Sequence, residues 1–269
     1  MPAPDADKFC IHEMDYIWIE FKKHVKEKDG SLTQILRIRK SKGLKNRTGL
    51  SKFYNIKAVY NINREKEFYR APIQYRNNEA EIKITAGKTS FFKVYVFVIT
   101  ETINYIAETS FYVFGSSKNP IHRDILRTEL DFLPNLKIIY PEYNYWPQTG
   151  QEFKFLLGSD KVNFTVNDAK VIDKGNIETL KLSPDGKFSY IPPSDKLLDL
   201  QGISAFKGNI LYFRMKSNNK ITKLTYTLLL HRSRFANLRL KHGIALFVGT
   251  IIFFTFSVLI ARKRSPVII

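Results

Sequence analysis

The sequence predicts an all-β protein: two immunoglobulin-like antiparallel β-sandwich domains followed by one C-terminal transmembrane helix. Three observations predict this. Short segments rich in aromatic and β-branched residues recur between turn signals. These segments lack the 3.6-residue hydrophobic period of helices. Residues 244–261, in contrast, form one stretch without a charged residue.

The first sandwich is expected over residues 12–116, after an N-terminal tail at 1–11. Gly, Ser, Asn and Pro then open a polar stretch that we interpret as a linker, residues 117–133. Within this linker, residues 121–132 fit a short helix and an extended connection equally well. The strands of the first sandwich are expected in DYIWIEF, LTQILRIR, AEIKITA, FFKVYVFVI and AETSFYVFG.

The second sandwich is expected over residues 134–231. Its sharpest local signal is LSPDGKFSY, in which Pro184 suits the fixed-φ position of a type I turn and Gly186 a position with positive φ. This turn predicts a hairpin over residues 178–191, which the following Pro192-Pro193 pair ends because proline cannot donate to a sheet. The strands are expected in NLKIIYP, EFKFLL, KVNFTV, ETLKLS, KFSYIPP and KLTYTLLL.

The uncharged stretch at 244–261 predicts the transmembrane helix. Its 18 residues reach about 27 Å as a helix, close to the thickness of a hydrocarbon core. Its large apolar residues also point in several directions around the axis, whereas a helix buried in a soluble core would keep a polar stripe. Residues 262–269 are then a short tail beyond the span.

The side of the membrane on which the sandwiches lie is not fixed by the residues alone. The first residues lack the basic start and apolar core of a secretion signal, so a tail-anchored cytoplasmic protein and an exported one whose signal is missing both remain open. Basic residues flank the predicted span on both sides and give no preference. The juxtamembrane segment, residues 232–243, fits both an interfacial segment and a helical extension of the anchor.

Basic residues concentrate in two places in a chain of net charge +18: residues 37–52 and the juxtamembrane segment. Few aromatic residues lie within the first stretch, so it predicts attraction to phosphate without base readout, and we do not expect nucleic-acid binding. Next to a membrane anchor, such residues favour anionic lipid headgroups or an acidic partner. The candidate contact residues are Arg37, Arg39, Lys40, Lys42, Lys45, Arg47, Arg232, Arg234, Arg239 and Lys241.

A candidate metal site lies near the N-terminus. On an extended chain Cys10, His12 and Met14 share one face, and a thiol, an imidazole and a thioether suit copper(I), with nickel less favoured. Nickel, cobalt and copper are the candidate metals, and no other cofactor is expected. Since Cys10 is the one cysteine, internal disulfides are excluded.

The motifs of common enzyme classes do not occur in the sequence. It has no glycine-rich phosphate loop, nucleophile elbow, zinc-spaced cysteine pair or HExxH helix. We therefore expect a non-enzymatic protein.

Within residues 182–264, two features are the most specific: Pro192-Pro193 with Asp195, and the HRSR at 231–234. With these features the C-terminal third resembles a bacterial family of extracytoplasmic proteins associated with nickel and cobalt uptake transporters. The resemblance implies immunoglobulin-like sandwiches outside the cytoplasmic membrane, a C-terminal anchor with residues 262–269 as a cytoplasmic tail, and an accessory or structural role in a larger integral membrane complex. The chain departs from the family in lacking the N-terminal signal and the histidine-rich stretches of metal-uptake partners. A metal-binding or metal-delivering role for the N-terminal cluster is the alternative function.

Overall fold

A computed structural model describes most of the chain. The described residues are 14–41, 56–63, 67–76, 79–117, 121, 123–126, 135–140, 150–158, 164–173, 176–193, 207–217, 220–230, 247 and 250.

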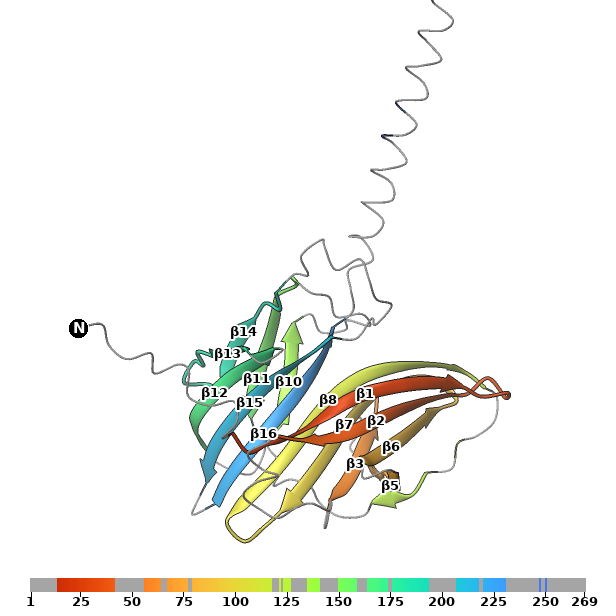
Figure 1. The fold of residues 1–269 in the computed structure, drawn as a ribbon, viewed down its shortest axis with the longest axis horizontal. Coiled ribbons are helices and arrows are strands. Elements are labelled where there is room, and N and C mark those ends of the chain that lie inside the picture. The colour runs from red at the N-terminus through yellow and green to blue at the C-terminus, as the bar shows by residue number, and fades with distance from the viewer. Residues whose placement is uncertain are drawn as a thin grey trace, which may run out of the picture.

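The centre of the molecule is a nine-stranded sheet that draws strands from both halves of the chain (Figure 1). Its order is β13-β12-β15-β16-β8-β7-β3-β4-β9. Neighbouring strands are antiparallel except β8 and β16, which pair in parallel from Ile103↔Ile221 to Thr109↔Thr227. The strands are β3 (Lys57–Ile62), β4 (Phe68–Arg70), β7 (Lys88–Ile99), β8 (Ile103–Ser116), β9 (Ile125–Leu126), β12 (Thr165–Asp173), β13 (Asn176–Thr179), β15 (Lys207–Ser217) and β16 (Lys220–Leu230).

A four-stranded antiparallel sheet covers one face of the central sheet, over the strands of the first half. Its order is β1-β2-β6-β5, and in Figure 1 β1 and β2 lie across β7 and β8. The core between the two sheets includes Ile19, Leu36 and Phe92, each without exposed surface. The strands are β1 (Ile17–Lys26), β2 (Leu32–Lys40), β5 (Ile73–Arg76) and β6 (Glu79–Ala86).

A three-stranded antiparallel sheet covers the opposite face, over the strands of the second half. It consists of β10 (Asn135–Tyr140), β11 (Phe153–Gly158) and β14 (Lys187–Tyr190) in that order. Phe155 of β11 is fully buried, and its ring stacks on Phe188 with the centroids 4.9 Å apart. Such aromatic pairs contribute about 0.5–1.5 kcal/mol beyond the area that they bury.

Strand β7 explains how one sheet serves two cores. Because successive side chains of a strand point to opposite faces, Val94 and Val96 enter the core under the four-stranded sheet, whereas Tyr95 and Phe97 enter the other core. A strand buried on both faces reads as a nearly continuous apolar run, as FFKVYVFVI does. The molecule is therefore a three-layer assembly of β-sheets.

The all-β fold class is confirmed over the described residues. Apart from the helical Phe247 and Thr250, regular structure there consists of strands. Within those ranges no helix has the length and apolar character needed to cross a bilayer. The predicted span 244–261 lies outside the described residues except for these two positions, as do the tails at 1–11 and 262–269 and the segment 232–243.

The strands of the two predicted sandwiches separate by sequence yet share the central sheet. Strands β1–β8 fall within residues 12–116 and strands β10–β16 within 134–231, and the pairing of β8 with β16 joins the two sets. Strand β9 lies in the predicted linker, where it pairs with β4 and is extended rather than helical. The domain boundaries themselves stay predictions.

For the hairpin predicted over residues 178–191, the turn is confirmed but the pairing of its two strands is wrong. Ser183 N–H donates to Lys187 O at 2.9 Å, and Gly186 has a φ of 78°. The flanking strands, however, belong to different sheets, because β13 pairs with β12 and β14 pairs with β11. The turn thus carries the chain between layers, and a Cβ on Gly186 would lie 2.4 Å from Leu157 O.

Candidate functional site

The most distinctive chemistry of the described chain is a buried polar junction where the two sandwiches meet. On the face toward the four-stranded sheet, the Lys223 ammonium on β16 forms an ion pair with the Asp15 carboxylate just before β1. Tyr105 Oη on β8 donates to the second carboxylate oxygen at 2.8 Å. The side chains of Asp15 and Lys223 are only 10% and 8% exposed, so this pair is largely removed from water.

The Asp15 carboxylate stays ionised because its partners outweigh its burial. Burial raises the pKa of Asp15, but the hydrogen bonds from Lys223 and Tyr105 and the lysine charge together hold that pKa below its ordinary value of 3.8. The charge pair is therefore kept intact at neutral pH. It ties the first strand of the chain to the last.

A second ion pair lies on the opposite face of the central sheet. Lys93 Nζ on β7 lies 2.6 Å from Glu108 Oε1 on β8, and Glu108 has no exposed side-chain surface. The backbone of Leu136 on β10 completes the group: its N–H donates to Glu108 Oε2 at 3.2 Å and its carbonyl accepts from Lys93 Nζ at 3.1 Å. Burial raises the pKa of Glu108 against the lowering effects of Lys93 and the Leu136 N–H.

Hydroxyl groups close the junction along β8 and β16. Thr109 Oγ1 donates to Thr227 O at 2.8 Å, and Thr225 Oγ1 donates to Ile17 O at 2.6 Å. The junction thus joins three layers through ion pairs and hydrogen bonds. These contacts fix the relative position of the two sandwiches.

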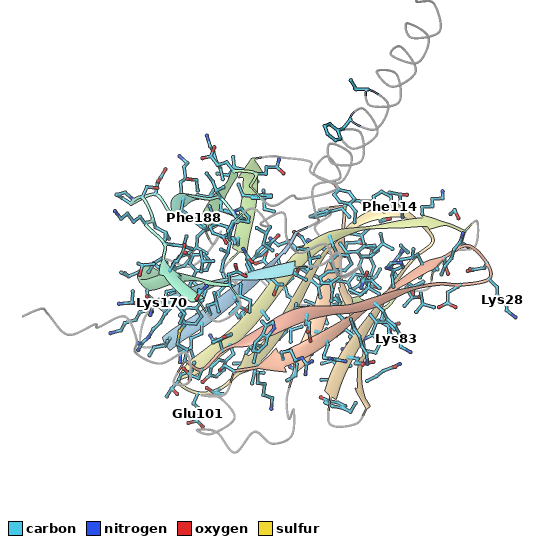
Figure 2. All side chains as sticks on the ribbon, turned by 45° about the horizontal axis from the view of Figure 1, so that its top comes forward. Lys28, Lys83, Glu101, Phe114, Lys170 and Phe188 are labelled. Carbon is cyan, nitrogen blue, oxygen red and sulfur yellow. The ribbon has the colours of Figure 1, made fainter. Side chains whose placement is uncertain are left out.

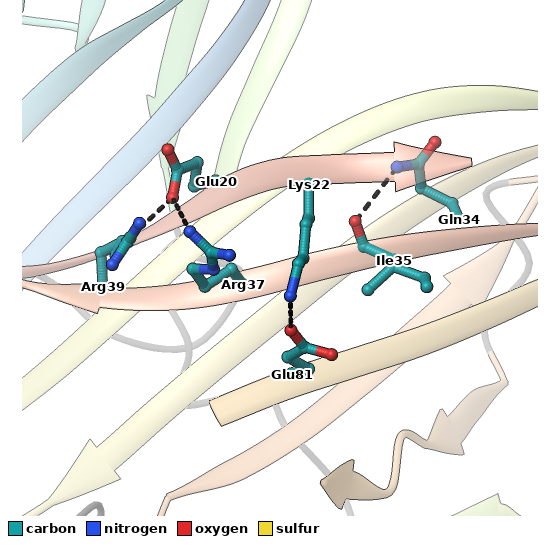
Figure 3. Close-up of polar contacts among 7 residues, drawn as sticks. All are labelled: Glu20, Lys22, Gln34, Ile35, Arg37, Arg39 and Glu81. Atoms are coloured by element: carbon teal, nitrogen blue, oxygen red, sulfur yellow. Dashed lines mark hydrogen bonds and ion pairs between the residues drawn. The ribbon is translucent and has the colours of Figure 1, made fainter. Parts of the chain in front are cut away.

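The outer face of the four-stranded sheet carries a second set of charges (Figure 3). Glu20 on β1 accepts from Arg39 Nε at 2.6 Å and lies 3.6 Å from Arg37 Nη1, both on β2. Lys22 forms an ion pair with Glu81 on β6. Because Glu20 is 44% exposed, water screens its pairs, and each contributes at most about 1 kcal/mol to stability.

The predicted contact residues are only partly within the described chain. Arg37 and Arg39 lie on this outer face, where they bind Glu20, and Lys40 is 8% exposed at the end of β2. Their predicted role in binding lipid or a partner stays a prediction. The others lie outside the described residues: Lys42, Lys45, Arg47, Arg232, Arg234, Arg239 and Lys241.

The predicted metal cluster also falls mostly outside the described residues. Cys10 and His12 lie there, whereas Met14 is half-buried and packs against a small cluster that includes Tyr16 and Tyr212. Among the residues that the structure describes, no group of three or more His, Cys, Asp or Glu side chains is placed to hold a metal ion. Metal binding by the three N-terminal residues stays a prediction.

Sequence reasoning missed the residues of the buried junction. A usable signal was present, because Glu108 stands in YIAETSFYV and Lys223 in KLTYTLLL, each a charge within an otherwise buried strand. A charge in such a position is rarely buried without a partner. The identity of the partner depends on the parallel pairing of β8 and β16, which local sequence does not encode.

The comparisons with known proteins identify neither a family nor a function. No protein-family model matches the chain, and no curated protein matches it. Among solved structures, the full ectodomain of mouse nectin-like molecule 4, Ig1 to Ig3, is similar over 80% of this chain and 64% of that one, with 8% identity and a TM-score of 0.21. The chain therefore spans less than two thirds of that structure, and a likeness at this level carries no argument.

Proposed function

We propose that this protein is a non-enzymatic accessory subunit, anchored in the bacterial cytoplasmic membrane by residues 244–261, whose sandwiches face the periplasm or exterior. In this proposal the sandwiches are immunoglobulin-like and bind a larger integral membrane complex. The resemblance of the C-terminal third makes a nickel or cobalt uptake transporter the first candidate for that complex.

The position of β16 is the observation that carries the proposal. This strand ends at Leu230, shortly before the proposed anchor, and it lies inside the central sheet between β15 and β8. It contributes Leu224, Tyr226 and Leu228 to one core and Leu229 to the other. An anchor attached to such a strand is coupled to both sandwiches at once.

The buried junction supports a binding role for the same reason. Two ion pairs and several hydroxyl contacts hold the sandwiches in one relative position, so a partner meets a preformed surface. Preformed surfaces lose less conformational entropy on binding than flexible ones. A rigid body held beside the membrane is well suited to contact a transporter there.

Co-purification from native membranes tests this proposal. The affinity-tagged full chain, extracted in mild detergent, is expected to bring down one membrane complex in constant stoichiometry. A matched chain with Leu228→Arg and Tyr226→Arg, which places charges in a buried core, is expected to lose the partner. Recovery of the wild-type chain alone under gentle extraction, with and without crosslinking, would refute the proposal.

A further inference from the structure

The pairing of β8 with β16 defines which end of the central sheet leads to the proposed anchor. Parallel strands run in the same direction, so the end of β8 at Ser116 lies at the same edge as the end of β16 at Leu230. We call this edge the anchor end. The turn between β7 and β8 lies at the opposite edge, the far end, and Figure 2 shows Lys28 and Glu101 at opposite ends of the sheet.

The turns of the outer sheet are fixed to the anchor end. Gly30 O, in the turn between β1 and β2, accepts from Ser116 N–H at 3.0 Å. Ser117 Oγ donates to Asp29 at 3.0 Å, and Ser117 N–H donates to Gly87 O in the turn between β6 and β7 at 2.7 Å. The side chains on these turns therefore hold a defined place at this edge.

An aromatic patch lies at the anchor end, on the face of the central sheet that carries Glu108. Phe91 and Tyr112 are cross-strand partners on β7 and β8, with ring centroids 5.0 Å apart. Phe114, two residues further along β8, is 43% exposed and lies on the upper side of the molecule in Figure 2. Tyrosine rings settle at the headgroup level of a bilayer, and phenylalanine rings enter the boundary between headgroups and acyl chains.

Exposed lysines lie at the same edge as the aromatic patch. Lys26 and Lys28 lie at the turn between β1 and β2, and Lys88 opens β7. Glu27 and Asp29 lie among them, but the Asp29 carboxylate accepts from Ser31 and Ser117. Lysines at the same edge as aromatic rings complement a surface of anionic lipid, which attracts the ammonium groups while the rings enter the interface.

We propose that the anchor end docks on an anionic bilayer surface through Phe91, Tyr112 and Phe114, with Lys26, Lys28 and Lys88 binding the headgroups. This inference rests on the proposed function, because the anchor brings that edge of the sheet toward the membrane. It extends the proposed function by naming the face of the protein that contacts lipid. Docking of this kind sets the height and tilt of the sandwiches above the bilayer.

Tryptophan placement in the full chain tests the inference. The chain is reconstituted in vesicles of phosphatidylglycerol and phosphatidylcholine with brominated acyl chains, which quench nearby tryptophan. Phe114→Trp is compared with Ile99→Trp, which lies at the far end of β7 and is similarly exposed, at 45%. After subtraction of the wild-type signal, we expect quenching at position 114 and none at position 99.

The lysines are tested in the same vesicles. In Phe114→Trp, the triple change Lys26→Gln, Lys28→Gln and Lys88→Gln is expected to weaken docking by roughly fivefold per lysine, and high salt is expected to do the same. A control triple at the far end is expected to leave the quenching unchanged: Lys57→Gln, Lys216→Gln and Lys220→Gln.

Two different failures are distinguishable. A chain that alkaline carbonate removes from the vesicles has no membrane anchor, and both the proposed function and the docking are then wrong. A chain that resists carbonate but shows equal quenching at positions 114 and 99, or none at either, overturns the docking alone. Quenching that the lysine changes and salt leave untouched would contradict the role of anionic lipid.

Discussion

Removing the buried lysine of the junction is the most informative change to the fold. Lys223→Met keeps most of the side-chain volume but leaves the Asp15 carboxylate, whose side chain is 10% exposed, with the hydrogen bond from Tyr105 Oη and without the ammonium group. Breaking a buried ion pair in this way costs about 3–5 kcal/mol. Since a domain of ordinary stability unfolds with about 5–15 kcal/mol, the expected loss is a large fraction of the total.

A second variant separates the charge from the packing. Asp15→Asn combined with Lys223→Met removes both charges and keeps an acceptor for the Tyr105 hydroxyl. Because the uncompensated charge is gone, this pair of changes is expected to recover about 2 kcal/mol relative to Lys223→Met alone. The comparison isolates the electrostatic part of the effect.

The pH dependence of stability tests the same electrostatic effect independently. In the wild-type chain the lowered pKa of Asp15 contributes stability that is present above its unfolded value, near 3.8, and is lost as the pH falls through the folded value. Without Lys223, burial is opposed by the hydrogen bonds from Tyr105 and from the Asp15 backbone, so the pKa of Asp15 is expected to rise. The deficit of Lys223→Met relative to wild type should therefore be larger at pH 7 than at pH 4.

Urea unfolding of the full chain in detergent micelles, followed by tryptophan fluorescence, measures these differences. The ring of Trp18 lies 5.4 Å from that of Tyr16, next to Asp15, and reports on the junction. A loss below about 1 kcal/mol for Lys223→Met, or a double variant no more stable than the single one, would refute the electrostatic reasoning.

Three further predictions concern the second sandwich. Gly186→Ala should destabilise the chain by at least about 1–2 kcal/mol because φ is positive, whereas Gly158→Ala, whose Cβ meets nothing within 4 Å, should cost less; a thermal melt compares them. Phe155→Ala should lower the free energy of unfolding by about 3–5 kcal/mol, because Phe155 is fully buried. Ile191→Ala should lower it by less than about 1 kcal/mol, because Ile191 is 58% exposed. Similar losses for the two variants in urea unfolding would contradict the assignment of Phe155 to the core. The pKa of Asp185, lowered by hydrogen bonds from its neighbours, should be about 2 in an NMR titration, and an ordinary value would mean that the turn is not formed.

Two strands of the central sheet could be predicted from their long apolar runs. FFKVYVFVI and KLTYTLLL became β7 and β16, since both lie in the central sheet and carry side chains into cores. Strand β15 was not among the predicted strands, and Gly208 and Asn209 near its start are residue types common in turns. In the folded chain Asn209 is buried, and its amide donates to the hydroxyl of Tyr190.

Pairing between strands was less predictable than the strands themselves. The Ser183–Lys187 turn has the predicted local geometry, yet its flanking strands enter different layers. Turn chemistry fixes backbone angles over a few residues, whereas the partner of each strand is chosen by the core that its side chains enter. The buried junction could not be predicted for the same reason, since Asp15 and Lys223 meet only after the first and last strands have assembled.

The orientation of the chain across the membrane is the claim on which the proposed function depends. It is tested by adding trypsin to intact spheroplasts that express the chain with an epitope tag after Ile269. The proposal predicts that the sandwiches are digested from outside, while a short tagged fragment containing residues 244–269 is protected by the membrane. Full protection of the sandwiches, or recovery of the whole chain from the soluble fraction without detergent, would contradict it.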